Sequence, residues 1–188
     1  MASTLHWKSA DLEALPDVEG TRYEIIGGEL FVSTTPHFNH QILCGTLLRL
    51  LENWSIQTKL GKTVFAPGLI FADDDDVIPD VAWLSNERLS VALGEDGKLH
   101  SAPDLIIEVL SPGSRNRRRD REAKLKLYSR RGVLEYWIVD WRTRSIEVYR
   151  RPNEQLDRIA TWVTGDVLAS PLLPGFSAPV EDLFATLP

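Results

Sequence analysis

The chain has 188 residues, of which 43% are hydrophobic and 26% are charged, a composition that supports one well-formed core and excludes long disordered regions. The net charge of −6 and the isoelectric point of about 5.2 argue against a protein that coats nucleic acid by bulk electrostatic attraction. Cys44 is the only cysteine, which excludes an intramolecular disulfide and a cysteine-rich zinc site.

The N-terminal stretch "MASTLHWKSADLEALPD" has neither the basic start nor the apolar block of a secretory signal. No apolar run along the chain approaches the length that a membrane span requires. We therefore expect a cytoplasmic protein without a membrane partner.

The first elements are an antiparallel hairpin and a helix. Gly27-Gly28 separates two apolar runs in "YEIIGGELFVS", which predicts strands at about 22–26 and 29–33 because both glycines tolerate positive φ. After Pro36, Asn39 is a candidate helix cap. Leucines then recur at helical spacing as far as Trp54, so the helix should continue to about residue 58.

The middle of the chain is rich in β-forming residues. The segments "KTVFAPGLIFA" and "VIPDVAWLS" predict two strands or strand pieces, and the acidic run 73–76 between them is interpreted as a solvated turn. Residues 85–101 are polar and contain two glycines, which indicates a short helical turn and a loop. The segment "PDLIIEVLS" then predicts another strand.

The arginine-rich segment 115–121 is interpreted as a loop that leads into a helix over 120–131, which Gly132 ends. The segments "EYWIVD" and "RSIEVYR" predict two strands joined by a tight connection at 141–144. A further strand near "DRIATWVTG", a proline-rich passage and a short helix at "VEDLFATL" complete the chain.

Two carboxylates interrupt strands that are apolar on both faces. Asp80 shares a face with Ala82 and Leu84, while Val81 and Trp83 cover the other face. Glu108 likewise lies between Ile106 and Leu110 on one face, with Leu105, Ile107 and Val109 on the reverse. Such strands are typical of a sheet covered on both sides. An ionised carboxylate there must neutralise, pair with a cation or bind a metal.

Lys124 lies on the packed side of the helix 120–131, between Leu127 and Tyr128 at helical spacing. Asp80, Glu108 and Lys124 are thus predicted to point into one apolar interior, which is an active-site hypothesis. Each has a simpler explanation: Asp80 could open a strand after a proline, Glu108 could pair with backbone or arginine, and Lys124 could pair with Asp120 on the surface.

Together the three residues match the needs of phosphodiester hydrolysis. That reaction uses acidic ligands for a hard cation such as Mg²⁺ and a positive charge near the attacking water and the phosphate. Two carboxylates and one lysine supply both requirements. No segment of the sequence resembles a Ser-His-Asp or Cys-His arrangement.

The series "YEIIGGEL", "IPDVAWLS", "APDLIIEVLSP", "DREAKLKLY" and "GVLEYWIVD" resembles the Uma-two family of restriction endonuclease-like proteins, within the PD-(D/E)xK nuclease superfamily. The resemblance covers about residues 20–150. It implies one domain over 1–188 with a restriction endonuclease-like α/β core, in which helices flank a mixed central sheet in the order α-β-β-β-α-β, with an N-terminal hairpin and a C-terminal β extension.

The resemblance also assigns roles. Asp80 and Glu108 match the metal-binding acids of the superfamily and would hold Mg²⁺, with Mn²⁺ as the alternative ion. The superfamily's usual lysine lies two positions after the glutamate, where this chain has Leu110. Lys124 matches the lysine that Uma-two members carry on the following helix. The superfamily often has a further acid that assists. The best candidate for this fourth site residue is Glu24, with Glu29 as the second.

The leading hypothesis is therefore a metal-dependent endodeoxyribonuclease that forms a homodimer. The alternatives are a non-catalytic nucleic-acid-binding or protein-interaction module, and a structural module whose buried charges fix strand register. Arg115, Arg117, Arg118 and Arg119 could neutralise DNA phosphates beside the metal, with a solvated loop as the alternative. His40 is a weak candidate neighbour of the site, and His37 is expected to make ordinary polar contacts.

The chain's tryptophans are scattered along the sequence and are expected to belong mostly to the core. No pair of them predicts a platform for stacking nucleobases.

Overall fold

The computed structural model describes residues 5–188, except for the side chains of Ser114 and Arg115. Its elements, in chain order, are α1 (Ser9–Leu12), β1 (Arg22–Ile26), β2 (Glu29–Ser33), α2 (Phe38–Thr58), β3 (Gly61–Phe65), β4 (Leu69–Ala72), β5 (Asp75–Val77), β6 (Val81–Ser85), α3 (Asn86–Ala92), β7 (Leu105–Val109), α4 (Ser114–Arg118), the π-helical segment η1 (Arg119–Lys124), α5 (Leu125–Arg131), β8 (Glu135–Asp140), β9 (Ser145–Arg150), β10 (Asp157–Trp162), β11 (Val167–Leu168), β12 (Ala178–Pro179) and α6 (Val180–Phe184).

The central sheet has six strands in the order β10-β9-β8-β7-β6-β3. It is mixed, because β7 and β8 run parallel while the other neighbours run antiparallel. The helix α4-η1-α5 supplies the crossover that a parallel pair requires. Leaving aside the inserted β4, β5 and α3, the core order α2, β3, β6, β7, α5, β8 confirms the predicted α-β-β-β-α-β arrangement.

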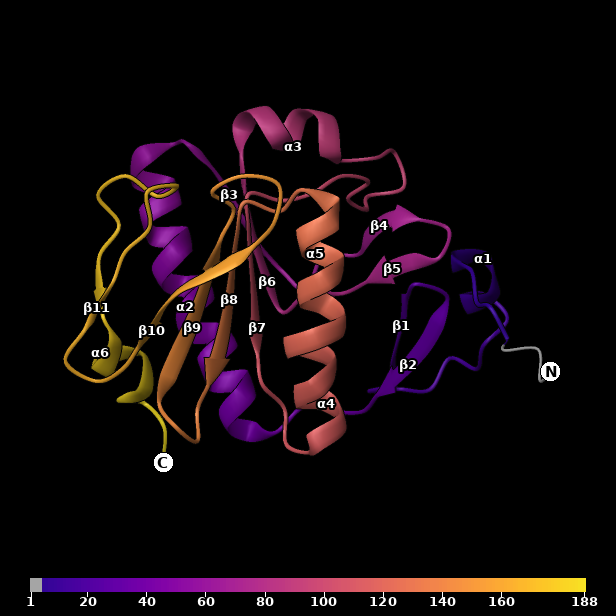
Figure 1. Cartoon of the computed structure of the whole chain (residues 1–188), viewed down its shortest axis with the longest axis horizontal. Helices are drawn as coiled ribbons and strands as arrows, with labels where there is room; N and C mark the ends of the chain where they lie inside the picture. The colour runs from indigo at the N-terminus through magenta and orange to yellow at the C-terminus, as the bar shows by residue number, and fades with distance from the viewer. Residues whose placement is uncertain (1–4) are drawn as a thin grey trace.

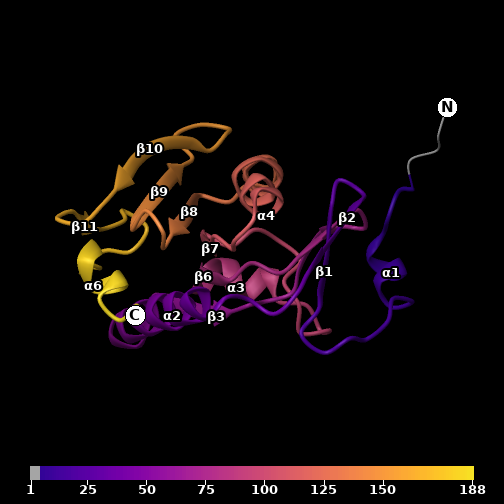
Figure 2. The ribbon, with the colours of Figure 1, turned by 90° about the horizontal axis from the view of Figure 1, so that it is seen from below.

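Helices cover both faces of this sheet (Figures 1 and 2). α2 and α6 pack on one face and the α4-η1-α5 helix packs on the other. The alternation predicted along β6 and β7 is confirmed, since Trp83 and Ile107 belong to the first core while Ala82 and Ile106 belong to the second. Asp80 and Glu108 therefore approach the face that carries α5.

A smaller antiparallel sheet, with the order β2-β1-β5-β4, lies beside the α4-η1-α5 helix (Figure 2). The β1–β2 hairpin is confirmed, and Gly27 and Gly28 have φ values of 58° and 77°, as a two-residue turn of this kind requires. Only the 73–74 end of the acidic run is a turn. Asp75 and Asp76 form the buried strand β5, so the prediction of a fully solvated turn was wrong.

Asp75 belongs in the interior because it is the anchor of the small sheet. Its carboxylate accepts hydrogen bonds from Arg130 and Arg131 of α5 at distances down to 2.6 Å, and from the N–H of Gly27 at 2.8 Å. Two guanidinium groups offset the cost of burying one carboxylate. This clamp fixes the hairpin that carries Glu24 against the helix that carries Lys124.

The long helix α2 begins earlier than predicted. Its N-cap is His37 rather than Asn39, and the ring Nδ1 of His37 accepts a hydrogen bond from the N–H of Asn39 at 3.1 Å. Pro36 precedes this cap. Cys44 is fully buried on α2, as its apolar neighbours indicated. Among the described residues, 5–188, no helix is both long and apolar enough to cross a membrane.

Candidate active site

A cavity of about 390 Å³ lies where the small sheet, the start of α2, the end of β7 and the helix segment η1 meet. Glu24, Asp80, Glu108 and Lys124 all line it. The structure thus brings together the four residues that the sequence put forward as catalytic, although they come from three different elements and the loop before β6.

Asp80 lies immediately before β6 and is 5% exposed. Its Oδ2 accepts a hydrogen bond from the N–H of Val109 at 2.9 Å and lies 3.0 Å from Nε2 of His40. Burial raises the pKa of Asp80, but the hydrogen bond and charge of His40, together with Lys124, outweigh burial and hold the pKa below its ordinary value. Asp80 is therefore ionised at neutral pH.

Glu108 projects from the middle of the central sheet. Its Oε1 accepts hydrogen bonds from Nζ of Lys124 and from the hydroxyl of Tyr128, both at 2.8 Å. Burial raises the pKa of Glu108 to about 8, and nearby carboxylates such as Asp80 reinforce the shift while Lys124 opposes it. The pKa of Glu108 is thus shifted upward, in the opposite direction from that of Asp80.

Lys124 is 1% exposed and bridges two carboxylates. Its Nζ lies 2.8 Å from Oε1 of Glu24 and 2.8 Å from Oε1 of Glu108. Burial lowers the pKa of Lys124, but Glu108 and Glu24 outweigh burial, so the net shift is upward and the ammonium stays charged. Leu110, at the superfamily's usual lysine position, is buried in the core. The helix therefore delivers to Glu108 the cation that the strand lacks.

Glu24, on β1, completes this network. Its Oε1 also accepts the N–H of Ile78 at 2.9 Å, and its Oε2 lies 3.4 Å from Nη1 of Arg119. Burial raises the pKa of Glu24, but Lys124 and Arg119 more than reverse that effect and lower it. Glu24 thus carries the negative charge that neutralises Lys124. Glu29, the second candidate for this role, is exposed.

The π-helical segment η1 explains why Arg119 and Lys124 converge. In a π-helix the backbone hydrogen bonds join residues i and i+5, so side chains five residues apart lie on the same side of the helix. Arg119 and Lys124 are five apart, at the two ends of η1, and both reach Glu24. In a regular α-helix, at 3.6 residues per turn, the two side chains would diverge.

The arginine-rich segment is helical from Ser114 onward, so the prediction of a loop was wrong. Arg119 is largely buried and pairs with Asp120 and Glu24, whereas Arg118 is exposed and pairs with Glu122 at 2.9 Å. Arg117 is half-buried. The side chain of Arg115 lies outside the described residues.

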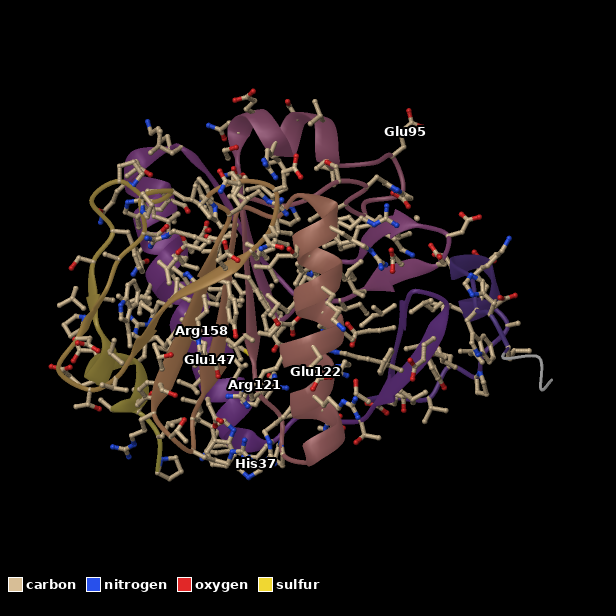
Figure 3. The ribbon with its side chains drawn as sticks, viewed as in Figure 1. His37, Glu95, Arg121, Glu122, Glu147 and Arg158 are labelled. Carbon is tan, nitrogen blue, oxygen red and sulfur yellow. The ribbon has the colours of Figure 1, made fainter. Side chains whose placement is uncertain are left out.

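One further charged pair joins the helix that carries Lys124 to the central sheet. Arg121, on the same helix, points toward Glu147 of β9 (Figure 3), and its Nη2 donates to Oε1 of Glu147 at 2.6 Å. Neither residue lines the cavity. This pair is a structural contact between the helix and the sheet.

The carboxylates of Asp80 and Glu108 share one feature of their hydrogen bonding. Among the described side chains, both hydrogen bonds to Asp80 end on Oδ2 and both hydrogen bonds to Glu108 end on Oε1. Oδ1 of Asp80 lies 3.7 Å from Nη1 of Arg22. Within the part of the chain that the structure describes, the hydrogen bonds of each acid therefore end on a single oxygen, and both acids line the cavity.

A second set of donor atoms shares Asp80. Ligand atoms of His40, Cys44 and Asp80 all lie within 4.8 Å of one another. Nitrogen and sulfur suit a softer ion such as Zn²⁺. Burial raises the pKa of the Cys44 thiol, and Asp80 and Glu108 raise it further, so the thiol remains protonated and a poor ligand.

Sequence reasoning missed Arg22, Asp120 and Tyr128. Arg22 lines the cavity, Asp120 is buried beside Arg119, and Tyr128 donates to Glu108. Tyr128 did carry a signal, because it follows Lys124 by four residues on the same helix and so shares its face. Arg22 carried none, since its partner Asp80 lies on another element, and the sequence suggested Asp120 only as a surface partner of Lys124.

Comparisons with known proteins place this chain in a family. The Uma2 family model, described as "Putative restriction endonuclease", matches residues 9–181. A protein from Anabaena variabilis ATCC 29413, whose crystal structure is described as that of "a putative nuclease", shares 18% identity with a TM-score of 0.75, covering 95% of this chain and 97% of that one.

The type IIG restriction endonuclease BpuSI shares 17% identity over 78% of this chain and 15% of its own, with a TM-score of 0.41, too low to carry an argument. A comparison of this chain with curated proteins found no match. The Anabaena structure shows that the two chains share a fold, and the family match extends over most of the length of this chain. The chain belongs to the Uma2 family of restriction endonuclease-like proteins.

Proposed function

We propose that this protein is a Mg²⁺-dependent endonuclease that hydrolyses phosphodiester bonds in DNA. The observation that carries the proposal is the pair of half-tethered carboxylates, Asp80 and Glu108, beside a charged lysine in one cavity. The Asp75 clamp shows that a carboxylate in this fold can be fully enclosed by cations, so the open oxygens of Asp80 and Glu108 need a different explanation.

Asp80 and Glu108 would hold the ion, with His40 and the N–H of Val109 fixing the orientation of Asp80. Mg²⁺ held there would supply a water of lowered pKa and would neutralise charge that develops on the phosphate.

Lys124 is charged, so it acts as a hydrogen-bond donor and an electrostatic stabiliser rather than as a base. Its Nζ already spans Glu24 and Glu108, and from there it can orient the attacking water or stabilise the pentacoordinate phosphate. Glu24 holds the ammonium in place. Arg22 and Arg119, which also line the cavity, add positive charge near the phosphate.

The test is cleavage of supercoiled plasmid and of single-stranded DNA in Mg²⁺ or Mn²⁺. Wild type should cleave, and Asp80→Asn and Glu108→Gln should not. Glu147→Gln is the matched control, because Glu147 is also a buried, ion-paired carboxylate of the central sheet but does not line the cavity. Equal cleavage by wild type and both site variants would overturn the proposal. DNA binding without cleavage in either metal would favour the non-catalytic module instead.

A further inference from the structure

Two aromatic rings are stacked at the rim of the catalytic cavity. The imidazole of His37 and the indole of Trp141 have centroids 4.8 Å apart and planes inclined by 13°. His37 also lines the cavity that holds Asp80 and Glu108. It lies at the end of the central sheet where α2 and α4 begin and β8 turns into β9 (Figures 1 and 3). The stack is therefore adjacent to the reacting groups.

The stack is held in position by the site's own elements. Nε1 of Trp141 donates to the carbonyl of Leu110 at 3.2 Å, just beyond the strand that carries Glu108. His37 is fixed by the hydrogen bond from the N–H of Asn39. The guanidinium of Arg142 lies over the Trp141 ring at 5.8 Å from its centroid. A ligand that stacked here would meet rings that are already ordered, which lowers the entropic cost of binding.

The outer side of this stack is accessible. His37 is exposed, and the next residue, Phe38, is 68% exposed at the first turn of α2. Resting on the proposed nuclease function, we infer that His37 and Phe38, backed by Trp141, form a stacking platform for an unpaired nucleobase, so that the substrate is single-stranded DNA.

Charge and geometry favour a single strand over a duplex. Duplex binding depends mainly on many phosphate contacts, and a chain of net charge −6 is poorly suited to provide them. Stacking on aromatic rings needs no such field. A base within a duplex has both faces covered by its neighbours, so only an unpaired base can use the platform. The phosphate of that nucleotide could then meet Arg22, Arg119 and Lys124 in the cavity.

The test measures binding without cleavage, by fluorescence anisotropy in the absence of divalent ions. The probes are a short single-stranded oligothymidine, the same strand with abasic sites in place of the bases, and a duplex. His37→Asn removes the ring but keeps a good helix cap, and Phe38→Leu keeps apolar bulk without a π face. Ile56→Ala is the matched control, because Ile56 is 61% exposed near the other end of the same helix.

Wild type should bind the oligothymidine more tightly than the abasic strand or the duplex. The His37→Asn and Phe38→Leu variants should each bind the oligothymidine about tenfold more weakly, because stacking contributes roughly 1–3 kcal/mol per base. Their affinity for the abasic strand should not change, and Ile56→Ala should bind as wild type does.

Equal weakening with both single-stranded probes would show that the rings act through structure rather than stacking, and would overturn the platform. Unchanged affinity in both ring variants would overturn it too. In either case metal-dependent cleavage that Glu108→Gln abolishes would leave the nuclease function standing. A wild-type protein that binds none of the three probes would also overturn the platform, whereas only the absence of metal-dependent cleavage would overturn the proposed function.

Discussion

Asp75 and Glu108 are both carboxylates buried among cations, yet their surroundings differ. Both oxygens of Asp75 are taken by the guanidinium groups of Arg130 and Arg131, with the N–H of Gly27 as a further donor. Among the described side chains, Glu108 accepts hydrogen bonds at Oε1 only, and it lines a cavity.

The two carboxylates also differ in pKa. Burial raises the pKa of Asp75, but its arginine partners outweigh burial and lower it, whereas burial raises the pKa of Glu108 to about 8. Asp75 is thus compensated within the fold, whereas the compensation of Glu108 by Lys124 is incomplete. Burial of a carboxylate does not by itself indicate a functional site. A buried carboxylate that is incompletely paired and lines a cavity does indicate one.

The largest effect should come from breaking the saturated clamp. Asp75→Ala leaves two arginines facing each other and should lower the free energy of unfolding by about 3–5 kcal/mol, as loss of one partner from a buried ion pair does. Urea denaturation measures this. The control is Asp74→Ala, because the Asp74 carboxylate forms an exposed ion pair with His6 at 3.7 Å, which should contribute about 0–1 kcal/mol. Similar losses in both variants would remove the contrast.

Glu108 should contribute to the pH dependence of stability with the opposite sign from Asp75, and Glu108→Gln should remove that contribution. The pKa of Glu108 is raised from an ordinary value of 4.5 to about 8, so between these values the folded state binds more protons than the unfolded one. Stability from this group is complete below pH 4.5 and is lost as pH rises through about 8. For Asp75, whose folded pKa is lowered from 3.8, stability is present above 3.8 and is lost on acidification.

The measurement is urea denaturation of wild type and Glu108→Gln, without metal, at a series of pH values between the two pKa values. The wild-type free energy of unfolding should fall relative to that of the variant by up to about 1.4 kcal/mol per pH unit. A difference that stays constant across the range would mean that Glu108 is ionised throughout, fully compensated by Lys124 in the manner of Asp75.

His40 tests whether the half-tethered geometry matters. It lies 3.0 Å from the Oδ2 of Asp80 and should act by orienting the carboxylate, as outer-shell partners of metal ligands do. His40→Ala should weaken Mg²⁺-dependent cleavage by about 10–100-fold. Titrating the rate with Mg²⁺ would show the loss mainly as a weaker apparent metal affinity. A lower maximal rate at unchanged metal affinity would instead place His40 in the chemical step.

The sequence could predict the acids because their signal is local. Asp80 and Glu108 stand out as charges between apolar neighbours, and β-alternation indicates which of those neighbours share a face with each acid. Lys124 follows from helical spacing. The hairpin follows from two glycines, which adopt the positive φ that the turn requires.

What the sequence could not predict depends on distant partners. The partner of Asp75 is Arg130, 55 residues away, so nothing near the acidic run distinguishes its buried end from its solvated end. The segment 115–119 lacks apolar periodicity, and η1 then changes the period, so neither the helix nor the inward turn of Arg119 could be read from spacing. His37 and Trp141 meet only because α2 begins at the end of the central sheet where β8 turns into β9.

Cys44 should have the smallest effect, and it decides between the two donor sets that share Asp80. If the functional ion is held by the open oxygens of Asp80 and Glu108, Cys44→Ala removes no ligand. The Mg²⁺-dependent cleavage rate should then stay within about threefold of wild type, because Mg²⁺ takes oxygen ligands and a protonated thiol offers none. Thermal denaturation checks that the variant is folded. A loss of cleavage as large as that in Asp80→Asn, in a folded protein, would move the metal to the set formed with His40 and make Glu108 a purely electrostatic neighbour.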